Sequence, residues 1–406
     1  MYLIIENYIA RDVKTLLNLG KAVPDLRHHC WIHAFGSVKV VIRQREIDRK
    51  NDKSNVDLFL QLISRTPEIL PYVRELDIQD RGRNVWHPQA LASTSQEDLT
   101  TLSLLLVKST RMKLRSFRIT STLVWSNLPI PLREAFFAMF SSPTLSDIAL
   151  SGILLPVNLL ALIRNLRVVD FQTGGVGPPT YHPSVASSTP KLVDALKIRD
   201  RNPFSNPMSV LGFSDHSFKP FSLLHLTYLE ICLPGKHLST VQEGLRVCRN
   251  LERFKVFVGT AGGLPHPLTL GSLTSLKSLT LSADITNILD SAIRFDWVID
   301  ALESIRSDSL LEDLTILIRT PSLELGKQCE WALLDVLFQS GESAKWSHLR
   351  SLKIIWCTAR SQDIQENRNE DFVQLLPSFM PHLHERGILK MQTTYSDTQY
   401  NFWTFT

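Results

Sequence analysis

Two pairs of histidines are the residues whose type and spacing come nearest to a metal site. His29 and His33 are four residues apart, which can place two imidazoles on one face of a helix for a zinc ion. A third ligand is not evident beside them, so a pair at an interface or in solvent is the alternative. His382 and His384 are two residues apart and offer no better geometry. We therefore expect no metal site.

Two further patterns could belong to an enzyme. Residues 174–177 (GGVG) follow a predicted strand as a phosphate loop would, but Pro178 and Pro179 come next. These prolines disfavour the helix whose N-terminus would face the phosphate. Glu312 and Asp313 are adjacent carboxylates, and neighbours in a strand point to opposite faces. The sequence also lacks the GxSxG, HExxH and P-loop motifs. We expect no catalytic residue and no cofactor.

The amino-acid composition bounds the class of protein. The 406 residues carry a net charge of +4, with 44% hydrophobic and 21% charged residues, which is typical of a folded, soluble chain. So small a charge does not predict a nucleic-acid partner, which a clustered basic stripe would indicate. The densest basic run, residues 43–53, also contains acidic residues, and we interpret it as a solvated loop.

The cysteines and the apolar segments indicate where the protein resides. Five cysteines stand at positions 30, 232, 248, 329 and 357, and none has CxxC spacing. The odd count favours a reducing compartment. The N-terminus lacks the charged and apolar regions of a signal peptide, and no run of about 18 apolar residues could span a bilayer. We expect a cytoplasmic or nuclear protein without membrane contact.

A six-residue pattern that recurs along the chain is its most informative feature. In residues 276–281 (LKSLTL), Leu276, Leu279 and Leu281 occupy positions one, four and six. The pattern occurs at 73–78, 114–119, 145–150, 166–171, 193–198, 226–231, 251–256, 276–281, 311–316 and 349–354. The mean step is roughly 31 residues, and each hexamer is predicted to be a short strand whose apolar residues face a core shared with the next copy.

Helical segments come before several of these hexamers. Residues 56–63, 131–140, 297–305 and 331–338 have the spacing of amphipathic helices. Outer helices that alternate with inner strands indicate an α/β fold with a parallel sheet. The pattern resembles leucine-rich repeats, whose usual period is roughly 20–29 residues. The resemblance implies a right-handed solenoid, a horseshoe with its sheet on the concave side.

We expect three parts along the chain. Residues 1–45 form a small helical module, with helices at 4–10, 13–20 and 25–35 and a strand at 38–42. Residues 46–391 form the irregular repeat region. It contains loops rich in glycine, proline and serine at 174–190 and prolines within 202–220, and it closes with a helix and a strand within 377–391. Residues 392–406 form an aromatic tail that caps the last repeat, docks a partner or frays.

The N-terminal part resembles the second part of a fungal F-box. The segments that carry the resemblance are 14–18 (KTLLN), 22–23 (AV), 27–29 (RHH) and 32–35 (IHAF). The spacer at 59–76 and the ending at 384–389 (HERGIL) are similar to those of mushroom-type fungal F-box-like proteins with degenerate leucine-rich repeats. The opening Leu-Pro of that family is missing here, so the module is degenerate: truncated, decayed or short.

This resemblance implies a non-catalytic substrate-recognition adaptor of a cullin-type (SCF) ubiquitin ligase. In that family the F-box helices dock on a Skp-type adaptor, and the repeats bind a protein target for ubiquitination. By this resemblance, the residues expected at the adaptor-facing surface are Leu16, Leu17, Val23 and Leu26. The alternative for these residues is that they pack the module's own core. The alternative for the whole chain is a free-standing protein-interaction scaffold with no ligase connection.

The polar residues of the later hexamers are the candidates for target binding. They are Tyr228, Arg253, Lys255, Lys277, Arg350 and Lys353. Strand alternation favours positions three and five of each hexamer, so Lys277 and Arg350, at position two, are expected at the rim. An acidic or phosphorylated segment could pair with Arg253 and Lys277. The alternative is that these residues form solvated strand faces with no partner.

Overall fold

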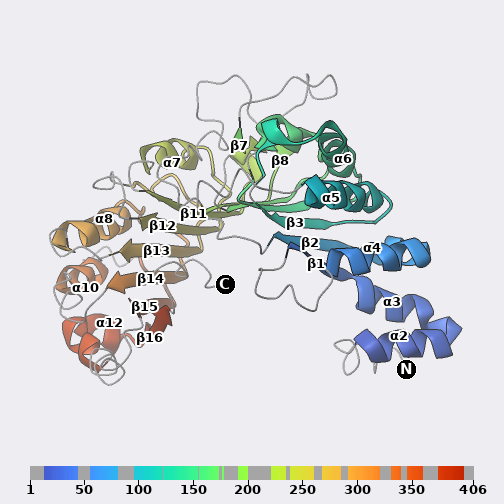
Figure 1. Cartoon of the computed structure of the whole chain (residues 1–406). Helices are drawn as coiled ribbons and strands as arrows, with labels where there is room; N and C mark the ends of the chain where they lie inside the picture. The colour runs from blue at the N-terminus through green and yellow to red at the C-terminus, as the bar shows by residue number, and fades with distance from the viewer. Residues whose placement is uncertain are drawn as a thin grey trace. The chain divides into compact units, whose positions relative to one another are not determined.

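The chain is a mixed α/β protein built on parallel strands (Figure 1). The computed structural model describes residues 13–43, 55–80, 96–121, 123–153, 155–172, 176–177, 191–199, 221–234, 238–259, 268–284, 291–320, 331–339, 345–359 and 374–396. Contacts along the chain divide it into two compact units. The first comprises mainly Met1–Val193, and the second comprises mainly Asp194–Phe204 and Ser222–Thr406. Each unit is described by itself below.

The first unit contains five parallel strands in the order β1-β2-β3-β4-β6. The strands are β1 (Ser37–Arg43), β2 (Glu75–Asp80), β3 (Ser116–Thr120), β4 (Asp147–Ser151) and β6 (Val168–Gln172). The helices between successive strands are α4 (Asn55–Arg65), α5 (Gln96–Ser109) and α6 (Ile130–Phe140). Shorter elements are η4 (Pro67–Tyr72), η6 (Trp125–Asn127), β5 (Leu155–Pro156), η7 (Val157–Leu162), β7 (Val176–Gly177) and β8 (Lys191–Leu192).

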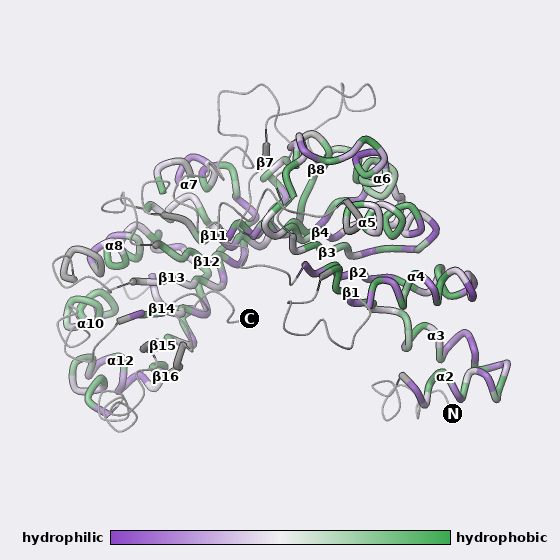
Figure 2. The backbone as a smooth tube through the Cα atoms, in the orientation of Figure 1, coloured by the Kyte–Doolittle hydropathy of each residue, from purple (hydrophilic) through white to green (hydrophobic). Residues whose placement is uncertain are grey.

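Helix α4 illustrates why these segments become helices against a sheet. Val56, Phe59 and Ile63 are buried at the spacing of one helix face, while Leu58 and Leu62 are exposed. Green and purple alternate along α4 in Figure 2, as a helix half covered by a core requires. Each large apolar side chain buried in this way contributes about 1.5–3 kcal/mol to stability.

The N-terminal module packs around a small core of its own. Helix α2 (Val13–Ala22), the 3-10 helix η2 (Pro24–Leu26) and helix α3 (Arg27–Phe35) enclose Leu16, Leu26 and Cys30. The helices approach closely at Gly20, where an added Cβ would lie 3.2 Å from the Cβ of Cys30. A side chain at position 20 would therefore require α3 to give way locally by a few tenths of an ångström.

The second unit contains seven parallel strands in the order β9-β11-β12-β13-β14-β15-β16. They are β9 (Ala195–Arg199), β11 (Tyr228–Pro234), β12 (Arg253–Gly259), β13 (Ser278–Asp284), β14 (Asp313–Thr320), β15 (Ser351–Ala359) and β16 (Leu389–Ser396). The helices between them are α7 (Leu238–Leu245), α8 (Ser291–Glu303), α10 (Trp331–Gln339) and α12 (Pro381–Glu385). The short elements β10 (Phe221–Ser222) and η10 (Leu223–His225) come before β11.

All ten predicted hexamers contain a strand of the structure, and each strand begins at the third position of its hexamer. The first position is buried in every copy, as at Leu276 and Leu311. The residue at the second position takes part in a recurrent hydrogen-bond pattern, in which its backbone carbonyl accepts two N–H groups from the next copy. The Glu252 carbonyl, for example, accepts the backbone N–H groups of both Lys277 and Ser278. The same arrangement links Gly36, Arg74, Arg115, Ser146, Asp194, Thr227, Lys277 and Glu312 to the strand that follows each in its sheet.

Several predicted segments lie outside the described residues. They are the helix at 4–10, most of the loops at 174–190 and 202–220, and the tail from residue 397 onward. The helices α5 and α7 were not predicted, although Leu238, Val241 and Leu245 do show helical spacing. None of the described helices combines the length and apolar character that crossing a bilayer requires.

Candidate interaction face of the second unit

The sheet of the second unit has one face toward its helices and one face that they leave open. Helices α7, α8, α10 and α12 lie on one side of the strands (Figure 1). Positions four and six of each hexamer, such as Leu279 and Leu281, face this side and are buried. Positions three and five, such as Arg253 and Lys255, therefore face the other side, which we call the open face.

The strand register gathers the fifth positions into a single row across the open face. We call this set the lysine row, and in spatial order it consists of Lys197, Glu230, Lys255, Thr280, Thr315, Lys353 and Lys390. Lys390 is exposed, while Lys197, Lys255 and Lys353 are half-buried. Long side chains of this kind keep their ammonium groups in water while their stems cover the sheet.

Tyr228 is the centre of a cationic cluster at one end of this row. The guanidinium carbon of Arg253 lies 5.0 Å from the centroid of the Tyr228 ring, and the amines of Lys197 and Lys255 lie 5.6 Å and 6.0 Å from it. Cations at these distances are attracted by the electron-rich face of the ring. The ring of Tyr228, on β11, thus gathers cations from both neighbouring strands: Lys197 from β9, and Arg253 and Lys255 from β12.

The carboxylate of Glu230 anchors this cluster from within. Its Oε1 lies 2.8 Å from Nε of Arg199, and its Oε2 accepts a hydrogen bond from the Tyr228 hydroxyl. Glu230 is only 8% exposed, so these two partners offset the cost of burying its charge. Burial, followed by the bond to Glu230, raises the pKa of Tyr228 above its usual range, and the phenol remains a neutral donor.

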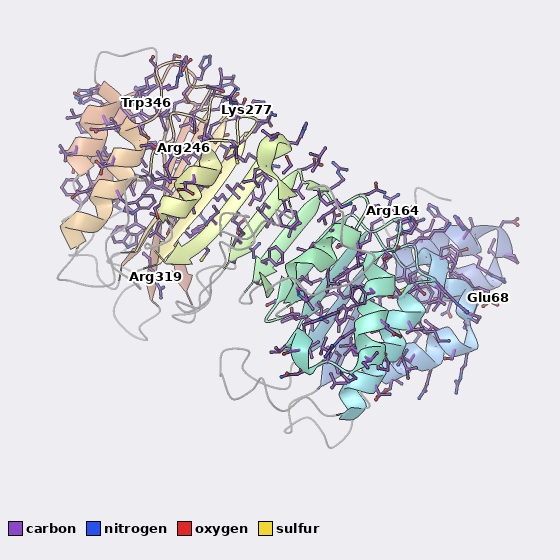
Figure 3. All side chains as sticks on the ribbon, turned by 90° about the horizontal axis from the view of Figure 1, so that it is seen from above. Glu68, Arg164, Arg246, Lys277, Arg319 and Trp346 are labelled. Atoms are coloured by element: carbon purple, nitrogen blue, oxygen red, sulfur yellow. The ribbon has the colours of Figure 1, made fainter. Side chains whose placement is uncertain are left out.

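Lys277 and Arg350 lie at the rim, as their second position in the hexamer predicted. Lys277 Nζ is 2.9 Å from Glu252 Oε1, and Arg350 Nη1 is 3.4 Å from Glu312 Oε2. Figure 3 places Lys277 and Arg319 at opposite ends of the strands. The structure thus brings together the predicted residues Tyr228, Arg253 and Lys255. Lys353 lies farther along the same row, whereas the two rim residues have acidic partners of their own.

Four members of this face were not among the predicted target-binding residues. They are Lys197, Arg199, Glu230 and Lys390. Lys197 is the fifth residue of the hexamer 193–198, so its position on the open face could have been found from the repeat alone. The bridge between Arg199 and Glu230 could not, because it runs diagonally: Arg199 is the register partner of Cys232, and Glu230 that of Lys197.

An apolar row borders the lysine row toward the carboxyl ends of the strands. It contains Cys232, Phe257, Ser282, Leu317 and Ile355, which the register places side by side. Leu317 is 4% exposed and packs with Cys357, Phe257 and Ile355. These five positions carry no charge and mark one boundary of the cationic part of the open face, while the register continues the row to Arg199 on β9 and Gln392 on β16.

The residues predicted to contact a Skp-type adaptor divide into two groups. Leu16 and Leu26 are buried with Cys30 in the module's own core, which is the alternative considered for them. Side chains enclosed in this way cannot reach a partner unless the module opens. Leu17 is half-buried, and Val23 is partly buried where it packs against that core. Of the four, Leu17 and Val23 retain surface that a partner could touch.

The candidate metal and catalytic residues form no larger group in the described part of the chain. The rings of His29 and His33 lie edge to face, with centroids 5.0 Å apart. The described residues contain no cluster of three or more histidine, cysteine, aspartate or glutamate side chains suited to a metal ion. Glu312 pairs with Arg350 at the rim, while the neighbouring Asp313 is exposed at the start of β14.

Comparisons with known proteins add little to this picture. No family model matches the sequence, and no curated protein matches it. A crystal structure of a Bacteroides fragilis protein, a structural-genomics target, aligns over 94% of this chain and 82% of its own chain, with 10% identity and a TM-score of 0.31. A TM-score of this size carries no argument about fold or function.

Proposed function

We propose that this chain is a non-catalytic substrate-recognition adaptor of a cullin-type ubiquitin ligase. In this proposal the open face of the second unit binds the protein target, and the N-terminal module docks on a Skp-type adaptor. The observation that carries the target-binding role is the cluster of Lys197, Arg253 and Lys255 around Tyr228. A cationic face on a rigid sheet is suited to holding a partner of opposite charge.

We also propose that the repeats form a leucine-rich-repeat-like solenoid. The support is the carbonyl that recurs at the second position of the hexamers and accepts two N–H groups from the next strand, as Thr227 does from Glu252 and Arg253. A contact that repeats from one copy to the next is the kind of nearest-neighbour interface from which solenoids are built.

The ligase role draws its support from the F-box-like segments of residues 14–35. The module they form has a buried core of Leu16, Leu26 and Cys30, so it can present a fixed surface rather than fold on binding. Leu17 lies beside this core and is half-buried. We therefore assign the adaptor contact to the surface around Leu17 and Val23, and not to Leu16 or Leu26.

The test is co-purification of the full chain with a Skp-type adaptor. A charge at Leu17, introduced as Leu17→Asp, should abolish capture of the adaptor, since it places a carboxylate in an apolar contact. Asn18→Asp is the matched control: it adds the same charge at an exposed neighbouring position and should leave capture intact. Circular dichroism should show that both variants keep their helices.

The second candidate function is a free-standing protein-interaction scaffold. The observation that favours it is the burial of Leu16 and Leu26, at 0% and 6% exposure, in the module's own core. Two of the four residues implied to contact the Skp-type adaptor are then enclosed in that core. A well-folded wild-type chain that captures no Skp-type adaptor would support the scaffold and end the ligase proposal. The target-binding role of the open face would be unaffected.

A further inference from the structure

The charge of the lysine row is not balanced by the residues around it. Lysines occupy four of its seven positions, and its single acid is Glu230. Glu230 is already engaged by Arg199 and Tyr228. Among the described residues, none of the four lysines has an acidic side chain as an ion-pair partner. Like charges held close together on one face raise its potential and favour a partner of opposite sign.

The rim of the same sheet shows the opposite arrangement. There Lys277 is paired with Glu252 and Arg350 is paired with Glu312. Acidic and basic residues alternate at the second positions before β12, β13, β14 and β15 (Glu252, Lys277, Glu312 and Arg350), so their charges are compensated locally. The excess of positive charge is therefore a property of the lysine row, with Arg199 and Arg253 beside it, rather than of the whole unit. The exposed Asp313 is the acidic residue in the adjoining row.

The dimensions of the row suit an extended chain that crosses the strands. Neighbouring strands are about 4.8 Å apart, so the six steps from Lys197 to Lys390 span about 29 Å. An extended segment rises about 3.3 Å per residue, and about nine residues cover that length. Thr280 and Thr315 lie between Lys255 and Lys353. Their hydroxyls can bond to the main chain of such a segment.

Carboxylates fit this row better than a nucleic acid does. Single-stranded nucleic acids bind through aromatic side chains on which their bases stack. Tyr228 is the aromatic residue of the cationic cluster, and it is 8% exposed. Its ring lies within 6.0 Å of the cationic groups of Lys197, Arg253 and Lys255. A base would have to displace these groups before it could stack there.

We propose that the lysine row binds an acidic, extended segment of a partner protein, with its chain running across the strands from β9 toward β16. The proposal rests on the target-binding role proposed for the open face and is independent of the ligase connection. Lys197 and Lys255 receive one end of the segment beside Tyr228, while Lys353 and Lys390 receive the other.

The test is fluorescence anisotropy of a labelled decapeptide of alternating glutamate and serine, titrated with the full chain and no other protein. The double variant Lys255→Glu/Lys353→Glu should weaken binding by about tenfold or more, since two attractive contacts become repulsive. Lys277→Glu, which changes a rim residue, should change the affinity by less than about twofold. Binding to the wild type should also weaken as salt is raised.

Three results would overturn the proposal: no binding of the peptide to the wild type, equal binding to the double variant, or an equal loss in Lys277→Glu. A labelled ten-residue thymidine oligonucleotide that bound more tightly than the peptide, with the same loss in the double variant, would assign the row to nucleic acid instead. Thermal unfolding verifies that each variant is folded. Since no Skp-type adaptor is present, failure of the ligase proposal cannot produce any of these results.

Discussion

At the scale of single residues, Tyr228 connects the energetics of the fold to the chemistry of the open face. Its hydroxyl donates to Glu230, which also pairs with Arg199. If the hydroxyl were lost, a carboxylate that is 8% exposed would have to rely on Arg199 alone. Removal of a hydrogen bond to a buried charged group costs about 1.5–3 kcal/mol. Tyr228→Phe should therefore lower the free energy of unfolding by an amount in this range.

The raised pKa of Tyr228 adds a pH dependence of known sign. Burial and the bond to Glu230 raise it above the ordinary value of 10.0, so the unfolded chain loses the phenolic proton first. The stability that this group contributes is complete below about pH 10 and declines as the pH rises above it. In urea titrations, the advantage of wild type over Tyr228→Phe should be constant from about pH 8 to about pH 9 and smaller at about pH 10.5. A difference that stays constant would contradict this assignment.

At the scale of elements, Asp335 ties helix α10 to helix α12. Its side chain is 3% exposed, and its oxygens accept the backbone N–H groups of His382 and Leu383 at 3.3 Å and 3.0 Å. These N–H groups belong to the first turn of α12, where the helix itself supplies no acceptor. The first turn of α12 is thus capped by Asp335, which lies 48 residues before Leu383 in the sequence.

Asp335→Ala should therefore loosen α12 specifically. The loss of a buried cap leaves two donors without an acceptor and costs about 1–3 kcal/mol. Hydrogen exchange followed by mass spectrometry should show faster exchange in residues 381–389, with little change in β13. The control Val336→Ala removes an exposed side chain from the same helix. If Val336→Ala accelerated exchange in α12 as much as Asp335→Ala, the cap would not be the cause.

At the scale of the whole molecule, the repeat made the strands predictable while the contacts between strands were not. A hexamer with apolar residues at positions one, four and six is a local signal, and all ten copies contain strands. The repeat also aligns β9 with β11 position by position, but the meeting of Arg199 with Glu230 is diagonal across that register and depends on side-chain conformations that no local pattern specifies. The same reason applies to Leu16, since its apolar character alone does not tell a core from a docking surface.

The parallel sheet of the second unit also sets where a mutation costs most. Leu279 is fully buried in β13, between Phe254 of β12 and Leu314 of β14. Leu389 is half-buried in β16, and its described neighbour in the sheet is Leu352 of β15. A repeat in the middle is supported from both sides, while the last strand is supported from one.

Leu279→Ala should accordingly cost roughly 2–5 kcal/mol, since it leaves a cavity with neighbours on both sides. Leu389→Ala should cost about 1 kcal/mol, because Leu389 is half-buried and its truncation removes less buried apolar surface. Urea unfolding gives both values, and hydrogen exchange shows how far each effect spreads. The first variant should expose amides in β12, β13 and β14 together, and the second only those of β15 and β16. Equal spreading from both sites would mean that the unit opens as one block, and the repeats would then not act as separate neighbours.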